Sequence, residues 1–82
     1  MRNGENATPF VHICGKDYTK TTDRTIKCYT NESGTFTLYV NNTSVATATM
    51  SDNIVTFAAQ NFNSGDVVRV AGTTTSDTFT FD

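Results

Sequence analysis

The sequence predicts an all-β fold, and three observations support this prediction. Threonine dominates the composition, whereas strong helix formers such as leucine and glutamine are scarce. No window repeats its apolar residues at intervals of three and four, which an amphipathic helix requires. Instead, apolar and polar residues alternate with a period of two, and the Thr, Val, Phe and Tyr side chains involved suit a half-buried pleated surface.

Seven short strands follow one another along the chain, separated by turn signals rich in Gly, Asn, Asp, Ser and Thr. The alternation places them at residues 10–14, 25–30, 35–40, 44–50, 53–59, 66–71 and 77–81. Short strands at this spacing are typical of an immunoglobulin-like β-sandwich of about seven antiparallel strands, and an open barrel is the alternative.

Six of the seven strands have an apolar side that we expect to face the core. The inward residues are Val11 and Ile13 in the first strand, Ile26 in the second, Phe36, Leu38 and Val40 in the third, Val55 and Phe57 in the fifth, Val68 and Val70 in the sixth, and Phe79 and Phe81 in the last. A slip of one residue would turn each set outward, so the register is well specified.

The third and fourth strands are predicted to form a hairpin in the stretch GTFTLYVNNTSVATATM, with Asn41 and Asn42 as its two-residue turn. A type I′ turn requires positive φ at both central residues, and asparagine tolerates this better than most side chains. Asn-Gly would be the stronger sequence for such a turn.

Length and charge limit the domain organisation and the partners. A chain of 82 residues supports a single domain, which we place at residues 9–82; the polar residues 1–8 are interpreted as a linker or a remnant of an excised piece. The net charge is −2, and the closest group of cations (Lys16, Lys20, Arg24 and Lys27) is interpreted as an ordinary solvated face. We therefore expect no nucleic-acid binding, and without an apolar run of about 20 residues we expect no membrane insertion.

The two cysteines, Cys14 and Cys28, are too few for a disulfide framework and lack metal-ligand spacing. Strand alternation places Cys28 on the side of Ile26 but turns Cys14 away from the side of Ile13. We therefore favour two free, largely buried thiols over a disulfide.

Catalytic and metal sites are not predicted. Glycoside hydrolysis needs two carboxyl groups held across the sugar, yet the acidic residues after position 30, including Glu32, Asp52, Asp66 and Asp77, lie in or beside different turns, where such residues usually cap loops. The single histidine, His12, has no acidic neighbour in the sequence and is interpreted as structural. We predict no catalytic residue, no cofactor and no metal ligand.

Aromatic residues are the candidates for contact with a partner. Tyr29 and Tyr39 should point away from the core, and Tyr18 and Phe62 lie in predicted loops. Aromatic rings can stack on the apolar face of a sugar, but outward tyrosines serve equally well to pack against a neighbouring domain. Domain packing is the favoured interpretation of Tyr18, Tyr29 and Tyr39, with weak carbohydrate contact as the alternative.

Four segments together resemble a known family. They are Val11-His12-Ile13, then IKCYTN (residues 26–31), FTLYVNNTSV (residues 36–45) and GDVVRVAG (residues 65–72). In this order they are similar to the C-terminal immunoglobulin-like domains of bacterial β-galactosidases and related family 2 glycoside hydrolases. The resemblance covers residues 9–82.

The resemblance implies a role inside a larger enzyme. In that family the catalytic glutamates lie on a separate (β/α)-barrel domain, so this chain would be a non-catalytic accessory domain of a parent that cleaves β-galactosides, and its partners would be neighbouring domains of the same parent. An independent carbohydrate-binding or cell-surface adhesion module is the alternative. The parent is expected to be bacterial and either secreted or at the cell surface, with a cytoplasmic location left open.

Overall fold

The computed structural model describes residues 8–15 and 19–82 of the chain. The described residues contain seven strands and no helix, which confirms the all-β prediction. The strands are β1 (Val11–Ile13), β2 (Arg24–Thr30), β3 (Thr35–Val40), β4 (Thr43–Thr49), β5 (Ile54–Gln60), β6 (Val67–Ala71) and β7 (Ser76–Thr80). Each boundary lies within one residue of the predicted one. Of the predicted linker, only Thr8 is among the described residues.

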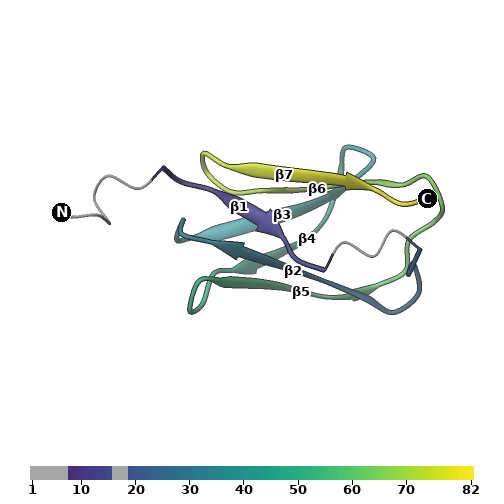
Figure 1. Ribbon diagram of the computed structural model, residues 1–82, viewed down its shortest axis with the longest axis horizontal. Helices are drawn as coiled ribbons and strands as arrows, with labels where there is room; N and C mark the ends of the chain where they lie inside the picture. Colours follow the sequence, from purple (N-terminus) through teal and green to yellow (C-terminus); the bar gives the residue numbers. More distant parts are fainter. Residues whose placement is uncertain (1–7, 16–18) are drawn as a thin grey trace.

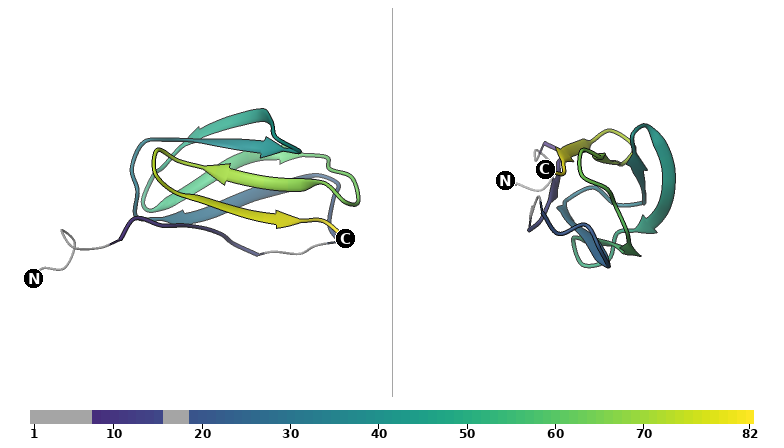
Figure 2. Two further views of the ribbon diagram at one scale, coloured as in Figure 1. Left: turned by 90° about the horizontal axis from the view of Figure 1, so that it is seen from above. Right: turned by 90° about the vertical axis from the view of Figure 1, so that its right-hand side faces the viewer.

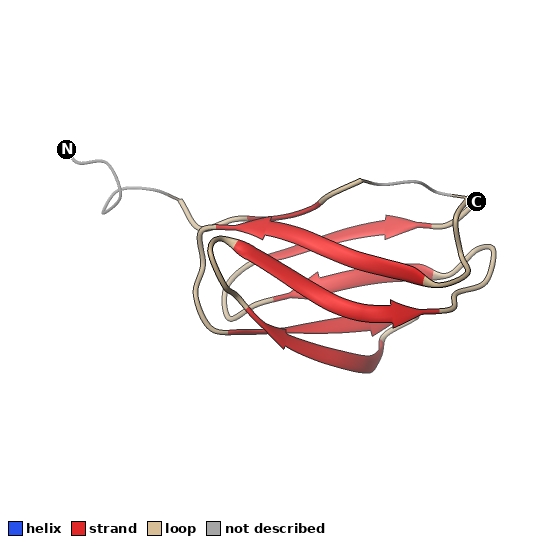
Figure 3. Ribbon diagram, turned by 90° about the horizontal axis from the view of Figure 1, so that it is seen from below, coloured by secondary structure: helices blue, strands red, loops and turns tan. Residues whose placement is uncertain are grey.

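The strands form two antiparallel sheets that pack face to face (Figure 1). One is a three-stranded sheet with the order β1-β2-β5, and the other is a four-stranded sheet with the order β4-β3-β6-β7. Figure 3 shows the two layers of strands and the loops that join them at both ends of the molecule. This arrangement confirms an immunoglobulin-like sandwich. The fourth strand pairs with the third, whereas in constant-type immunoglobulin domains it pairs with the fifth.

The core lies between the sheets and consists mainly of the predicted inward residues. The buried hydrophobic residues are Val11, Ile13, Ile26, Cys28, Phe36, Leu38, Val55, Phe57, Phe62, Val68, Val70, Phe79 and Phe81. Val40, which was predicted to be in the core, is only half-buried at its margin. Three members of the interior were not predicted: Phe62, Arg24 and Thr30.

Two of the turns that connect strands have a positive backbone φ at both central positions, which are occupied by asparagine or aspartate. Asn41 (φ 51°) and Asn42 (φ 70°) join β3 to β4, as predicted. Asp52 (φ 52°) and Asn53 (φ 67°) form a second turn of the same kind, which carries the chain from β4 in one sheet to β5 in the other. The short polar side chains of these residues tolerate the left-handed region.

Candidate functional site

Tyr29 lies on the outer face of the three-stranded sheet, within a small exposed patch. Alternate residues of β2 are buried, and Tyr29 is 50% exposed on the opposite side. Its ring lies beside that of Phe10, with centroids 6.1 Å apart and an angle of 37° between the planes. Across the sheet, Tyr29 pairs with His12 of β1 and Ile54 of β5. We call Phe10, His12, Tyr29 and Ile54 the Tyr29 patch.

Tyr39 lies on the outer face of the other sheet. It pairs with Arg69 of β6, whose guanidinium carbon lies 4.1 Å from the centre of the Tyr39 ring. This is a close cation–π contact, and it covers part of the ring face that a sugar would need for stacking. Tyr39 is therefore only half-exposed, and its free surface is smaller than that of Tyr29.

The predicted contact residues do not form one site. Tyr29 and Tyr39 both point away from the core, as the alternation indicated, but they belong to different sheets and lie on opposite sides of the sandwich. The right-hand view of Figure 2 shows these two outer faces end on. Tyr18, the third candidate, lies outside the described residues.

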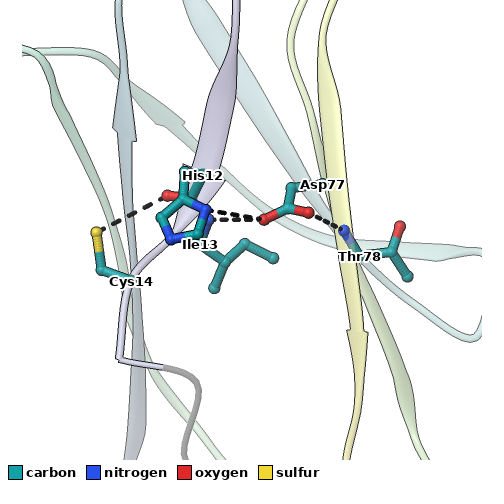
Figure 4. Close-up of polar contacts among 5 residues, drawn as sticks. All are labelled: His12, Ile13, Cys14, Asp77 and Thr78. Carbon is teal, nitrogen blue, oxygen red and sulfur yellow. Dashed lines mark hydrogen bonds and ion pairs between the residues drawn. The ribbon is translucent and has the colours of Figure 1, made fainter.

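Asp77 connects the last strand to the first at one side of the sandwich (Figure 4). Its Oδ2 accepts a hydrogen bond from the backbone N–H of Ile13 at 2.9 Å, and its Oδ1 accepts one from the backbone N–H of Thr78 at 3.0 Å. The Nδ1 atom of His12 lies 3.9 Å from the same Oδ2. His12 has no acidic neighbour along the chain, but it has one in space because β1 and β7 lie side by side.

The geometry around His12 does not assemble a nucleophile with a base. The Cys14 thiol is directed at the backbone carbonyl of His12, with its sulfur 3.8 Å from that oxygen (Figure 4). Nucleophilic catalysis would require the thiol to be within hydrogen-bond reach of the imidazole. The His12 side chain is also 65% exposed, so its contact with Asp77 is strongly screened by water.

Two further carboxylates, those of Asp66 and Glu32, hold turns together. Asp66 accepts hydrogen bonds from the Asn41 side chain and from the backbone of Asn63, both at 2.9 Å. Glu32 accepts them from the Thr75 hydroxyl at 2.5 Å and from the backbone N–H of Thr74 at 3.0 Å. The Thr75 hydrogen bond is the main cause that lowers the pKa of Glu32; burial opposes it, and weaker hydrogen bonds from Thr74 and Thr73 add to the lowering. These side chains act as loop caps, which is the role the sequence indicated.

The residues that the structure describes form neither a cluster of metal-ligating side chains nor a pocket. Within residues 8–15 and 19–82, no three His, Cys, Asp or Glu side chains are grouped so that they could hold a metal ion. The same part of the molecule has no detectable pocket. Any contact through its exposed aromatic residues would therefore use the open outer faces of the sheets.

Both cysteines are free, as favoured from the sequence. Cys28 is fully buried opposite Ile13, and burial, with smaller contributions from Cys14 and Asp77, raises the pKa of its thiol to about 12. Cys14 follows β1 and is only half-buried, so the expectation that both thiols are largely buried is correct for Cys28 alone.

Arg24 was predicted to lie on a solvated face, and this is wrong. Its side chain is 5% exposed and donates hydrogen bonds to the carbonyl oxygens of Lys20 and Gly15 at 3.1 and 2.8 Å. The guanidinium also lies 5.7 and 5.6 Å from the ring centres of Phe79 and Phe81. Arg24 occupies an inward position of β2, in phase with Ile26 and Cys28, and this alternation is the sequence signal that could have identified it.

Phe62 was predicted to be a loop aromatic with a surface role, and its position is a second correction. It lies in a loop but is 6% exposed and stacks on Phe81, with ring centroids 5.0 Å apart. The backbone N–H of Phe62 donates to the carbonyl of Thr21 at 2.8 Å, which fixes the loop over the end of the core. Phe62 is therefore a core residue and no candidate for partner contact.

Comparison of the chain with protein-family models and with curated proteins finds no match to either. None of the described residues forms a helix of the length and apolarity needed to cross a bilayer.

Proposed function

We propose that this chain is a non-catalytic immunoglobulin-like accessory domain, which packs against or spaces the neighbouring domains of a larger protein. Three features of the described residues support this proposal. These residues form no pocket, the Asp77 and Glu32 carboxylates are engaged in capping a strand edge and a turn, and the largest exposed hydrophobic side chains lie on the outer faces of the sandwich.

The observation that carries the proposal is the Tyr29 patch. Phe10 and Tyr29 are 40% and 50% exposed and lie in contact with each other, which places two aromatic rings on one open sheet face. Aromatic residues with an apolar body and a polar end are favoured where one protein surface packs on another. Phe10 also lies where the chain enters β1, held by a 2.9 Å hydrogen bond from its N–H to the Asn31 side chain.

The course of the chain fits a spacer. The described chain enters the sandwich at one end of its long axis, and Asp82 lies near the other end (Figure 1). Segments joined to the two ends would then be held apart by the length of the sandwich. The Tyr29 patch lies on the side by which the chain enters, so a domain that precedes Phe10 would contact it first.

The identity of the parent is inferred from the resemblance in the sequence. The order of the four segments that resemble family 2 glycoside hydrolases supports a β-galactosidase-like parent that cleaves β-galactosides, with its catalytic glutamates on another domain. This chain would then contribute to the arrangement of domains and not to the chemistry.

A carbohydrate-binding or adhesion module is the second candidate, and the same patch favours it. Two adjacent exposed rings form a platform of the kind on which a sugar ring stacks, and the His12 imidazole beside them could hydrogen-bond to its hydroxyl groups. The two functions therefore compete for one surface, which makes them separable by experiment.

Amide NMR spectra of the chain distinguish the two functions. We expect no saturable shifts with millimolar galactosides or with plant or mucin glycans. We expect shifts of Phe10, Tyr29 and Ile54 when the chain is extended by the flanking domain of its parent gene, and a Tyr29→Ala variant should lose part of that contact. Saturable sugar-induced shifts around Tyr29 would instead establish the carbohydrate-binding function. A flanking (β/α)-barrel with paired glutamates in the parent gene would support the glycoside hydrolase assignment, and its absence would remove it.

A further inference from the structure

The two sides of the sandwich differ in how their strand edges are protected. At the β1/β7 side, the Asp77 carboxylate accepts the outward N–H groups of Ile13 and Thr78. At the opposite side, β4 forms the rim of the four-stranded sheet (Figure 2). Natural proteins usually protect such an edge with charged side chains or proline. From Ser33 to Ser51 the sequence contains neither.

The open groups on β4 can be assigned from its pairing with β3. The backbone N–H of Met50 donates to the carbonyl of Gly34 at 3.0 Å, which sets the phase of the ladder. Because hydrogen-bonded and non-hydrogen-bonded pairs alternate in an antiparallel ladder, Ala48 and Ala46 bond to β3. The N–H and C=O groups of Thr47 and Thr49 therefore point outward from the sheet edge.

β4 has a regular backbone in the segment that contains Thr47 and Thr49. The register shift in the β3–β4 ladder falls at Val45, so residues 46–50 are free of the bulge. The other uncharged edge strand, β5, offers less, because its Ile54 is already bonded to Ser51 in both directions and a second irregularity interrupts its pairing with β2 between Arg24 and Ile26. Of these two uncharged edge strands, β4 thus has the longer regular stretch.

We propose that β4 is a self-association surface, at which a second copy of this chain adds its own β4 in antiparallel orientation. This proposal goes beyond the accessory role and does not depend on it. A two-fold axis at Ala48 would place Thr47 opposite Thr49 of the second copy, and Thr49 opposite its Thr47. Both are outward-bonding residues, so the pairing would form four backbone hydrogen bonds and join two four-stranded sheets into one.

The sequence of β4 is compatible with a copy of itself. In this register every facing pair is uncharged, and the two Thr–Thr pairs are of a kind that stabilises antiparallel strands. On the inner side of the strand, Ala46, Ala48 and Met50 are partly buried against the margin of the core. The second copy would cover their exposed parts, since Ala46 would face Met50 across the axis.

Sedimentation velocity over a concentration series, from about 10 µM to 1 mM, tests the proposal. We expect the unchanged chain to show a concentration-dependent monomer–dimer equilibrium. The double variant T47K/T49K places like charges opposite each other at both pairs and should weaken the dimer by roughly tenfold or more. T47K/T49E instead places opposite charges at the same pairs, so it should restore dimerisation to near the original level. Thr80→Lys, on the same sheet face but at the far edge, should leave the equilibrium unchanged.

Thr47→Pro tests the backbone pairing separately. The Thr47 N–H makes no bond to β3, so proline is tolerated at this edge position but removes a donor that the second copy needs. The variant should fold and remain monomeric, as far-UV circular dichroism and sedimentation would show together. A chain that stays monomeric at 1 mM overturns the proposal. So does a dimer that T47K/T49K and Thr80→Lys weaken equally, because that dimer would use another surface.

Discussion

The Asp77 carboxylate of β7 accepts the backbone N–H of Ile13 of β1 at 2.9 Å, although the two residues lie 64 positions apart in the sequence. β1 and β7 belong to different sheets, so this bond closes the gap between the two layers. The phase of the β1–β2 ladder, set by the bond from the Cys14 N–H to the Lys27 carbonyl, directs the Ile13 N–H outward. A single side chain thus satisfies an edge donor of each sheet.

Replacement of Asp77 should therefore destabilise the fold. Asp77→Ala leaves the N–H groups of Ile13 and Thr78 without an acceptor, and we expect the free energy of unfolding to fall by about 2 kcal/mol. Urea denaturation measures this loss, and amide hydrogen exchange should show reduced protection at Ile13. His12→Ala is the matched control, because it removes the exposed imidazole but keeps both amide bonds; it should change stability by less than about 0.5 kcal/mol. Equal losses in the two variants would contradict the edge-capping role.

The buried Cys28 thiol should make the fold sensitive to alkaline pH. Its pKa is raised to about 12 from an ordinary value of 9.0, so between these values the unfolded chain loses a proton that the folded chain retains. The folded state binds more protons in this window, and stability therefore falls as pH rises through it, by up to about 1.4 kcal/mol per pH unit. Well below pH 9 both states keep this proton, so the contribution of the group does not change with pH.

Comparison with Cys28→Ala isolates that contribution from the other groups that titrate at high pH. The difference in unfolding free energy between the original chain and this variant should be constant up to about pH 8.5 and then shrink. A thiol reagent should also label Cys14 before Cys28, because Cys28 is fully buried and its thiolate is suppressed. A constant difference through pH 10.5 would show that folding does not raise the pKa of Cys28.

Arg24 should contribute more to stability than the other arginine that contacts an aromatic ring. Arg24→Ala removes two hydrogen bonds to backbone carbonyls and leaves a cavity beside Phe79 and Phe81, so we expect a loss of about 3 kcal/mol in chemical denaturation. Arg69→Ala removes only a contact on the outer face of Tyr39 and should cost about 0.5–1 kcal/mol. Arg24→Lys keeps the charge but not the planar fork, and an intermediate loss is expected. Similar losses for Arg24→Ala and Arg69→Ala would contradict a buried role for Arg24.

The strands and most of the core could be predicted from the sequence because they depend on local alternation. Phe36 and Leu38, for example, occupy the inward positions that the pattern of β3 indicates. Arg24 follows the same alternation in β2, but its charge led to the opposite interpretation; its burial depends on the carbonyl groups and rings that surround it in the folded chain. Phe62 lies outside any strand, so no periodicity could place it.

The candidate site was harder to predict because it depends on which strands become neighbours. Alternation correctly predicted that Tyr29 and Tyr39 point outward. It could not predict that they lie on opposite sides of the molecule, because this depends on their strands belonging to different sheets. The contact between His12 and Asp77 requires β1 and β7 to lie side by side, and nothing local to either residue signals this. The contact of Arg69 with the Tyr39 ring could not be predicted either, because it follows from the pairing of β3 with β6.

The Asn41-Asn42 turn offers a last prediction, in which the same substitution has opposite effects at adjacent positions. Asn42→Gly should stabilise the fold by about 0.5 kcal/mol, because Asn42 has φ 70° and glycine adopts this conformation without strain. Asn41→Gly should destabilise it by about 1 kcal/mol, although φ is also positive there. The Asn41 side chain donates to Asp66 at 2.9 Å and accepts the Val67 N–H at 3.0 Å, and both bonds would be lost. Thermal or urea unfolding of the two variants measures the difference, and stabilisation by both would show that the Asn41 bonds contribute nothing.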